Sequence, residues 1–157
     1  SSDLVAGIVS TIGRVLDTLT GKPGQATGDA LGALAANNTS GSLKFNQRFP
    51  DGVPTSACGN GASMVKGVRY YSVIGNKALT NVLDPFDGMT TAISLLYAQP
   101  NDGMNDVCTQ RLGTVVGEYG WNHFDEVNQL AGLRGLFSAD PVSVYHAQVA
   151  RLKQEGL

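Results

Sequence analysis

The sequence predicts an α/β protein, because helical patterns and short β-rich runs alternate along the chain. Apolar residues at i, i+3 and i+4 spacing predict an amphipathic first helix over Asp3–Leu19. A run of β-branched and aromatic residues predicts a buried strand at Val68–Ile74. The 157 residues show neither a repeat nor an internal linker, and this length is enough for a real core. We therefore expect one α/β domain.

The other elements follow from capping residues, turn residues and short apolar runs. In chain order we expect a helix at Asp29–Ala36, a turn at Pro50–Pro54, a helix at Met89–Tyr97, a strand around Thr114–Val116, a helix at Asp125–Leu133 and a helix from Pro141 to about Lys153. Asp140 before Pro141 matches the N-cap and first position of a helix.

Charge and hydropathy exclude several classes of function. The 11 basic and 13 acidic residues give a net charge of −2, so nothing indicates binding to nucleic acid or to an anionic membrane. No apolar run approaches the ~18 residues of a membrane span. No signal peptide is visible, and the chain opens with Ser1 rather than Met, which suggests a processed product or a fragment.

Two cysteines, Cys58 and Cys108, leave two alternatives open. They lack the CxxC spacing of a metal or redox motif, so they are either buried thiols or one disulfide. A bridge would close a loop of about 50 residues and contribute roughly 4 kcal/mol in the chain-entropy model. A disulfide would also indicate an oxidising compartment.

His123 and Asp102 are the candidates for acid–base chemistry. His123 stands at an expected strand-to-helix junction, where a base would be exposed and oriented, although a lone histidine is usually structural. Asp102 lies in the loop sequence Asn-Asp-Gly and is either a turn former or the group that orients His123. The order Asp then His matches that of α/β-hydrolases, but the chain contains no G-x-S-x-G nucleophile motif.

Oxygen ligands for a calcium ion are a weaker pattern. Asp125, Gln129 and Leu133 are spaced i, i+4 and i+8, so they share one side of the expected helix. Carboxylate, amide and carbonyl oxygens suit calcium better than zinc. Asp84 could supply a second carboxylate. The alternative is that these polar residues simply face water.

A set of longer motifs carries a family resemblance. The chain resembles the bacterial true lipases of the Pseudomonas and Burkholderia kind, and in particular their shorter Pseudomonas aeruginosa-like branch. The resemblance is close from Phe45 to Leu157 and only loose over residues 1–44. The motifs are FPDGVPTSACG from position 49, YYS from 70, LTNVLDP from 79, NDG from 101, NHFDEVNQ from 122 and DPVSVY from 140, together with Cys108.

The resemblance implies a role for each matched position. It implies Asp102 as the triad acid, His123 as the triad base, Asp84 and Asp125 with the carbonyls of Gln129 and Leu133 as ligands of a structural Ca²⁺, a Cys58–Cys108 disulfide, and Asp3–Leu19 as a lid helix. Two departures stand out. Asn105 and Asp106 follow Met104 where the family has apolar residues, so Asp106 is a competing carboxylate, and Phe124 replaces the usual leucine.

The resemblance also implies what the chain is part of. It would be the C-terminal half of an α/β-hydrolase domain (1–157), with the serine nucleophile and oxyanion hole on an N-terminal half. The assembled protein would be a secreted triacylglycerol lipase of a Gram-negative bacterium, exported through the periplasm. It would act at the lipid–water interface, mature with a lipase-specific foldase, and be inactive as this chain alone.

Two other classes of function remain open from the sequence. The chain could be a non-catalytic, calcium-stabilised binding or scaffold module that kept part of a hydrolase. It could also be a complete enzyme of another kind that uses Asp102 and His123 without a serine. Labelling by a covalent serine probe separates these from the lipase hypothesis.

Overall fold

A computed structural model describes residues 39–129 and 132–157 of the chain. Its elements are α3 (Thr39–Arg48), β1 (Met64–Val65), β2 (Val68–Arg69), β3 (Tyr71–Gly75), α4 (Asp87–Ser94), β4 (Thr114–Tyr119), the 3₁₀ turn η1 (Asp125–Val127) and α5 (Pro141–Gln154). The expected helices Asp3–Leu19 and Asp29–Ala36 lie outside the described residues. The chain divides into two compact units, residues 1–50 and 51–157. No helix in the described ranges is both long and apolar enough to cross a membrane.

In the first unit, α3 is a helix that the sequence did not predict. Its opening residues Thr39–Ser42 are turn formers, and the helix carries its apolar side chains exposed. Phe45 in the helix and Phe49 just after it bring their ring centroids within 4.9 Å, one turn apart.

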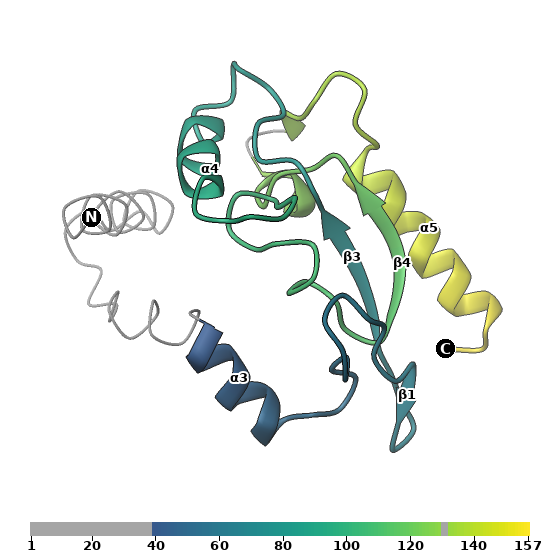
Figure 1. The fold of residues 1–157 in the computed structure, drawn as a ribbon. Coiled ribbons are helices and arrows are strands. Elements are labelled where there is room, and N and C mark those ends of the chain that lie inside the picture. The colour runs from purple at the N-terminus through teal and green to yellow at the C-terminus, as the bar shows by residue number, and fades with distance from the viewer. Residues whose placement is uncertain (1–38, 130–131) are drawn as a thin grey trace, which may run out of the picture. The chain divides into compact units, whose positions relative to one another are not determined.

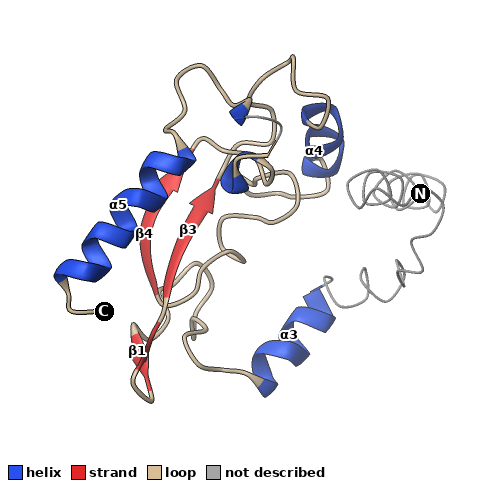
Figure 2. Ribbon diagram, turned by 180° about the vertical axis from the view of Figure 1, so that it is seen from behind, coloured by secondary structure: helices blue, strands red, loops and turns tan. Residues whose placement is uncertain are grey.

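The second unit is built around a parallel pair of strands. β3 and β4 pair from Tyr71 with Thr114 to Gly75 with Tyr119, with one register shift after Ser72. Figures 1 and 2 show α5 running alongside β4, and both strands point toward the end of the sheet where α4 and η1 lie. The mixed helix and strand content agrees with the predicted α/β class.

The expected single strand Val68–Ile74 is two strands in two different sheets. β2 pairs antiparallel with β1 through a tight turn at Lys66 and Gly67, which both have positive φ, as such hairpins require. At Tyr70 the chain leaves this hairpin and continues as β3 beside β4. β-propensity is similar on both sides of Tyr70, so the break could not be seen in the sequence.

The core of the described part is small. Ile74, Ile93 and Trp121 are its buried large apolar side chains. Trp121 stacks on Tyr119 with 4.2 Å between ring centroids, and its indole N–H donates to the Ala139 carbonyl at 2.8 Å. This bond ties the end of β4 to the segment before α5.

Two predicted helices need correction and two elements are confirmed. α4 covers Asp87–Ser94, so it begins and ends earlier than the predicted Met89–Tyr97. The predicted helix Asp125–Leu133 is wrong, because η1 ends at Val127 and Asn128 adopts left-handed φ and ψ. α5 begins at Pro141 as predicted and the turn at Pro50–Pro54 is present.

Candidate active site

The loop after α4 forms a tight turn around a buried carboxylate. The Asn101 side-chain oxygen accepts from the Gly103 N–H at 2.9 Å, and Gly103 has φ of +95°. Asp102 Oδ1 accepts from the backbone N–H groups of Met104 and Asn105 at 2.7 and 2.6 Å. Asp102 is fully buried, and its second oxygen, Oδ2, remains for another partner. The turn former and the candidate acid are therefore the same residue.

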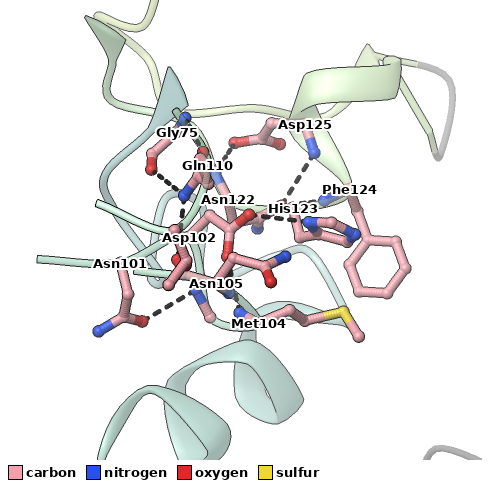
Figure 3. Close-up of polar contacts among 12 residues, drawn as sticks. Gly75, Asn101, Asp102, Met104, Asn105, Gln110, Asn122, His123, Phe124 and Asp125 are labelled. Carbon is pink, nitrogen blue, oxygen red and sulfur yellow. Dashed lines mark hydrogen bonds and ion pairs between the residues drawn. The ribbon is translucent and has the colours of Figure 1, made fainter. Parts of the chain in front are cut away.

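His123 supplies that partner (Figure 3). Its Nδ1 lies 2.8 Å from Asp102 Oδ2, and its backbone N–H donates to the Asp102 carbonyl at 2.9 Å. The imidazole is 37% exposed, and no other described residue hydrogen-bonds its Nε2. Asp106 instead accepts from the backbone N–H groups of Cys108 and Thr109. The structure thus brings Asp102, and not Asp106, to the ring.

The electrostatics of the pair suit a base. The hydrogen bond to Asp102 is the largest effect on His123 and raises its pKa above the ordinary value, against the opposing effect of burial. An aspartate on Nδ1 leaves Nε2 as the atom that accepts a proton. Among the described residues no hydroxyl or thiol bonds Nε2. The arrangement can therefore act chemically as an acid–base pair toward a nucleophile that the described residues do not supply.

Glu126 is the residue at this site that the sequence reasoning missed. Its carboxylate forms a group with the Asp102 carboxylate and the His123 imidazole, and the ligand atoms of the three residues are within 4.8 Å of one another, close enough to hold a metal ion. Glu126 Oε1 is buried without a hydrogen-bond partner, and burial followed by the Asp102 charge raises the pKa of Glu126 to about 7. Its position three residues after His123 was the available signal.

We predict that Glu126→Gln makes stability less dependent on pH. The pKa of Glu126 rises from 4.5 in an unfolded chain to about 7, so the folded state binds the extra proton between those values. Stability should therefore fall as pH rises from 4.5 to 7 in the wild-type protein. The variant should lose this part of the slope and be the more stable protein above pH 7. Urea unfolding at pH 4.5, 6 and 8 measures the free energy of unfolding of both proteins. An equal dependence of that free energy on pH in the wild type and the variant would contradict the prediction.

The predicted metal ligands are held in two neighbouring loops. Asp84 and Asp125 are 4% and 2% exposed, and neither forms an ion pair with a described basic side chain. Burial raises the pKa of both carboxyls, and each of them also feels the charge of Asp87. Asp125 Oδ1 and Gln129 Oε1 are buried without hydrogen-bond partners. Asp125 therefore keeps one buried oxygen without a partner, whereas Asp84 Oδ1 accepts from the Phe86 N–H at 2.8 Å and lacks only a basic partner.

The predicted single helical face for these ligands is wrong. Asn128 interrupts the helix, and the Gln129 N–H turns back to the Phe124 carbonyl at 3.1 Å. A hydrogen bond, and not a helix, connects the segment that contains Leu133 to the Asp84 loop: the Asn81 side chain donates to the Arg134 carbonyl at 3.1 Å. Loop contacts, rather than i, i+4 spacing, decide where these residues lie.

The loop that carries Asp102 is connected to other parts of the described structure at two further points. Cys58 and Cys108 form a disulfide, which resolves the alternatives left open by their spacing. The Gln110 side chain bonds both the N–H and the carbonyl of Gly75 at 2.9 Å, and it also donates to the Asn105 carbonyl at 3.0 Å (Figure 3). The loop that carries Asp102 is therefore attached to the end of β3.

Comparison with known proteins gives one consistent result. The chain is 46% identical over 158 residues to a triacylglycerol lipase of Vibrio cholerae, an alignment that covers 100% of this chain and 50% of that protein. Triacylglycerol lipases of Pseudarthrobacter phenanthrenivorans and Burkholderia plantarii are each 32% identical over 190 aligned positions, covering 100% of this chain and 58% and 52% of those proteins. The chain spans about half the length of these curated relatives. No protein-family model matches it.

Proposed function

We propose, from the premise that this chain is a homologue of bacterial triacylglycerol lipases, that it supplies the acid and base of a Ser-His-Asp ester hydrolase. The observation that carries this proposal is the 2.8 Å contact between His123 Nδ1 and the buried Asp102 carboxylate, with Nε2 left available. Such a base serves any acyl transfer. The relatives are named triacylglycerol lipases, and we assign the ester bonds of long-chain acylglycerols as the substrate.

The reaction uses His123 twice. Nε2 takes the proton of a serine hydroxyl as its oxygen attacks the ester carbonyl, and then gives that proton to the departing alcohol. Asp102 keeps the ring in one tautomer and stabilises the imidazolium. Water repeats the sequence on the acyl-serine, and the carboxylic acid leaves. The serine and the oxyanion hole lie, in this proposal, on an N-terminal half of an α/β-hydrolase fold.

The exposed surface of the described part supports a missing companion. Val82, Leu83, Leu95, Leu136 and Phe137 are each more than three-quarters exposed, whereas three large apolar side chains are buried. Parallel strands such as β3 and β4 are normally covered on both faces. The N-terminal half is the partner that we assign to these surfaces, and Asp3–Leu19 is the proposed lid helix at the lipid–water interface.

A structural calcium ion fits the loops around Asp84 and Asp125. The unpartnered oxygens of Asp125 and Gln129 and the absence of a described basic partner for either aspartate support a hard cation there. Asp84, Asp125, Gln129 and Leu133 would hold it. The ion supplies charge neutralisation and joins the two loops. Asp125 is two residues from His123, so the joined loops would keep the base in position.

Secretion through the periplasm with a lipase-specific foldase completes the proposal. The Cys58–Cys108 disulfide supports an oxidising compartment.

The deciding experiment is denaturing intact-mass analysis with peptide sequencing of the protein as isolated, after reaction with a fluorophosphonate probe. The proposal expects the probe on a serine in a G-x-S-x-G segment outside these 157 residues. The same sample should hydrolyse triolein emulsions. A sample that contains this chain but neither binds the probe nor hydrolyses esters would favour the non-catalytic module. Retained activity without labelling would indicate an enzyme of another kind.

A further inference from the structure

Asp87, at the start of α4, is a buried carboxylate with no role in the reaction described above. It is 1% exposed, and no described basic side chain pairs with it. Its Oδ2 accepts from the backbone N–H groups of Thr80 and Asn81, both at 2.5 Å. Its Oδ1 accepts from the Asn122 side-chain amide at 2.5 Å. A buried charge with only neutral donors is costly, so its partners are held firmly in place.

Asn122 connects this carboxylate to the candidate base. It is fully buried and directly precedes His123. Its side-chain oxygen accepts from the backbone N–H groups of Phe124 and Asp125, both at 2.9 Å. The turn that presents His123 is therefore closed over one amide group (Figure 3). The nitrogen of that amide is bonded to Asp87.

The residue on the other side of His123 is held by the same segment. Phe86 stacks on Phe124 with 4.7 Å between ring centroids and 28° between the ring planes. Phe86 and Asp87 are adjacent, and they contact the two residues that flank His123. The base therefore lies between one polar contact and one apolar contact, both made by the start of α4.

We infer that Asp87 is a positioning residue for His123: through the Asn122 amide it holds the turn that sets the distance between His123 and Asp102. This inference deepens the proposed function and rests on it for the kinetic consequence. It differs from the calcium proposal because the contact needs no ion. Loss of the contact should disturb the His123–Asp102 hydrogen bond even when calcium is saturating.

The test uses a pair of substitutions in the assembled protein, at saturating calcium. In Asp87→Asn the new amide can still accept from Thr80 and Asn81, but its NH₂ meets the NH₂ of Asn122, donor against donor. In the double variant Asp87→Asn/Asn122→Asp the donor and acceptor exchange places, and the bonds to Thr80 N–H, Asn81 N–H, Phe124 N–H and Asp125 N–H and the bond between the two side chains can all form. Glu118→Gln is the matched control, since Glu118 accepts from Asn76 at 2.9 Å in an exposed amide–carboxylate pair.

Two readouts are needed. The first is the proton NMR signal of His123 Nδ1–H, observed with ¹⁵N-histidine in this chain, whose other histidine is His146. The second is steady-state ester hydrolysis. Asp87→Asn should lose or broaden the downfield signal and lower kcat by about 100-fold with little change in KM, because small misplacements of a base cost that much. The double variant should recover the signal and at least about tenfold of the rate. Glu118→Gln should match the wild type in both.

The outcomes separate this inference from the proposed function. A wild-type protein without esterase activity overturns the proposed function, whereas the NMR signal still tests the positioning role. An active wild type with an unaltered signal and rate in Asp87→Asn overturns the positioning role alone. If Asp87→Asn does not fold, the double variant decides: recovery of the folded protein and its signal supports the contact, and failure to recover either overturns it.

Discussion

Replacing Asp102 with asparagine is expected to lower kcat/KM for ester hydrolysis by about 10⁴-fold, the loss typical when the orienting aspartate of a catalytic triad becomes an amide. The Asp102 carboxylate accepts from Nδ1 of His123 at 2.8 Å. An amide at this position can present its NH₂ to Nδ1 and hold the ring in the wrong tautomer. The measurement is steady-state hydrolysis of a soluble ester by the assembled protein.

The pH profile provides a second check on the same variant. His123 must be neutral to accept a proton, so the rate should rise with pH through the pKa of His123, which Asp102 raises above 6.5. Removing the carboxylate removes the largest cause of that increase, so the acid limb should move to lower pH while the rate falls.

Asp106→Asn is the matched control for Asp102, four residues along the same loop. Its oxygen accepts from the N–H groups of Cys108 and Thr109, and an asparagine oxygen can do the same. This variant should keep nearly full activity. If Asp102→Asn retained a tenth of the wild-type activity, the assignment of Asp102 as the acid would be wrong. It would also be wrong if Asp106→Asn lowered the activity as much as Asp102→Asn does.

Saturating calcium is expected to raise the melting temperature of the metal-free protein by roughly 10 °C. A ligand at a thousandfold excess over Kd stabilises the folded state by about 4 kcal/mol, and each kcal/mol corresponds to about 2–4 °C at this size. Asp84 and Asp125 are buried close to another carboxylate, so a cation relieves their repulsion. Scanning calorimetry in EDTA and in calcium measures the shift.

The dependence on pH follows from the sign of the shifts. The pKa values of Asp84 and Asp125 are raised by burial, so the metal-free protein should lose stability as pH rises from about 4 upward through the folded pKa values. Calcium should remove this loss. Asp125→Asn should therefore be more stable than the wild type in EDTA, and it should gain little from calcium. Asp106→Asn should keep the full shift, and an unchanged wild-type melting temperature in EDTA would rule out a structural ion.

Elements with a local signal in the sequence were predictable. The Asp140–Pro141 start placed α5 correctly, and the apolar run at Thr114–Val116 identified the beginning of β4. The prediction of a helix at Asp125–Leu133 was wrong because Asn128 adopts a left-handed conformation. Asparagine tolerates that conformation but also occurs in helices, so its presence in the sequence does not predict the break. The break at Tyr70 failed because it depends on which strand lies beside the chain, not on the residues themselves.

The candidate site shows the same division. The resemblance implied a base, an acid and two calcium carboxylates, and the structure brings Asp102 to His123 in preference to Asp106. Glu126 and Asp87 were not identified. Asp87 contacts Asn122 across 35 residues of sequence. Glu126 is close to His123 in sequence, but it matters because it is buried, and burial is not encoded in a local pattern.

By itself, the sequence determined which side chains are available for chemistry: one imidazole in a motif, a carboxylate in a turn, oxygen donors and two cysteines. Only the tertiary structure decided which of them meet. Side-chain identity sets what a group can donate, accept or ionise. The loops from three distant parts of the chain set the distances and exclude water, and distance and burial turn an aspartate and a histidine into a candidate catalytic pair.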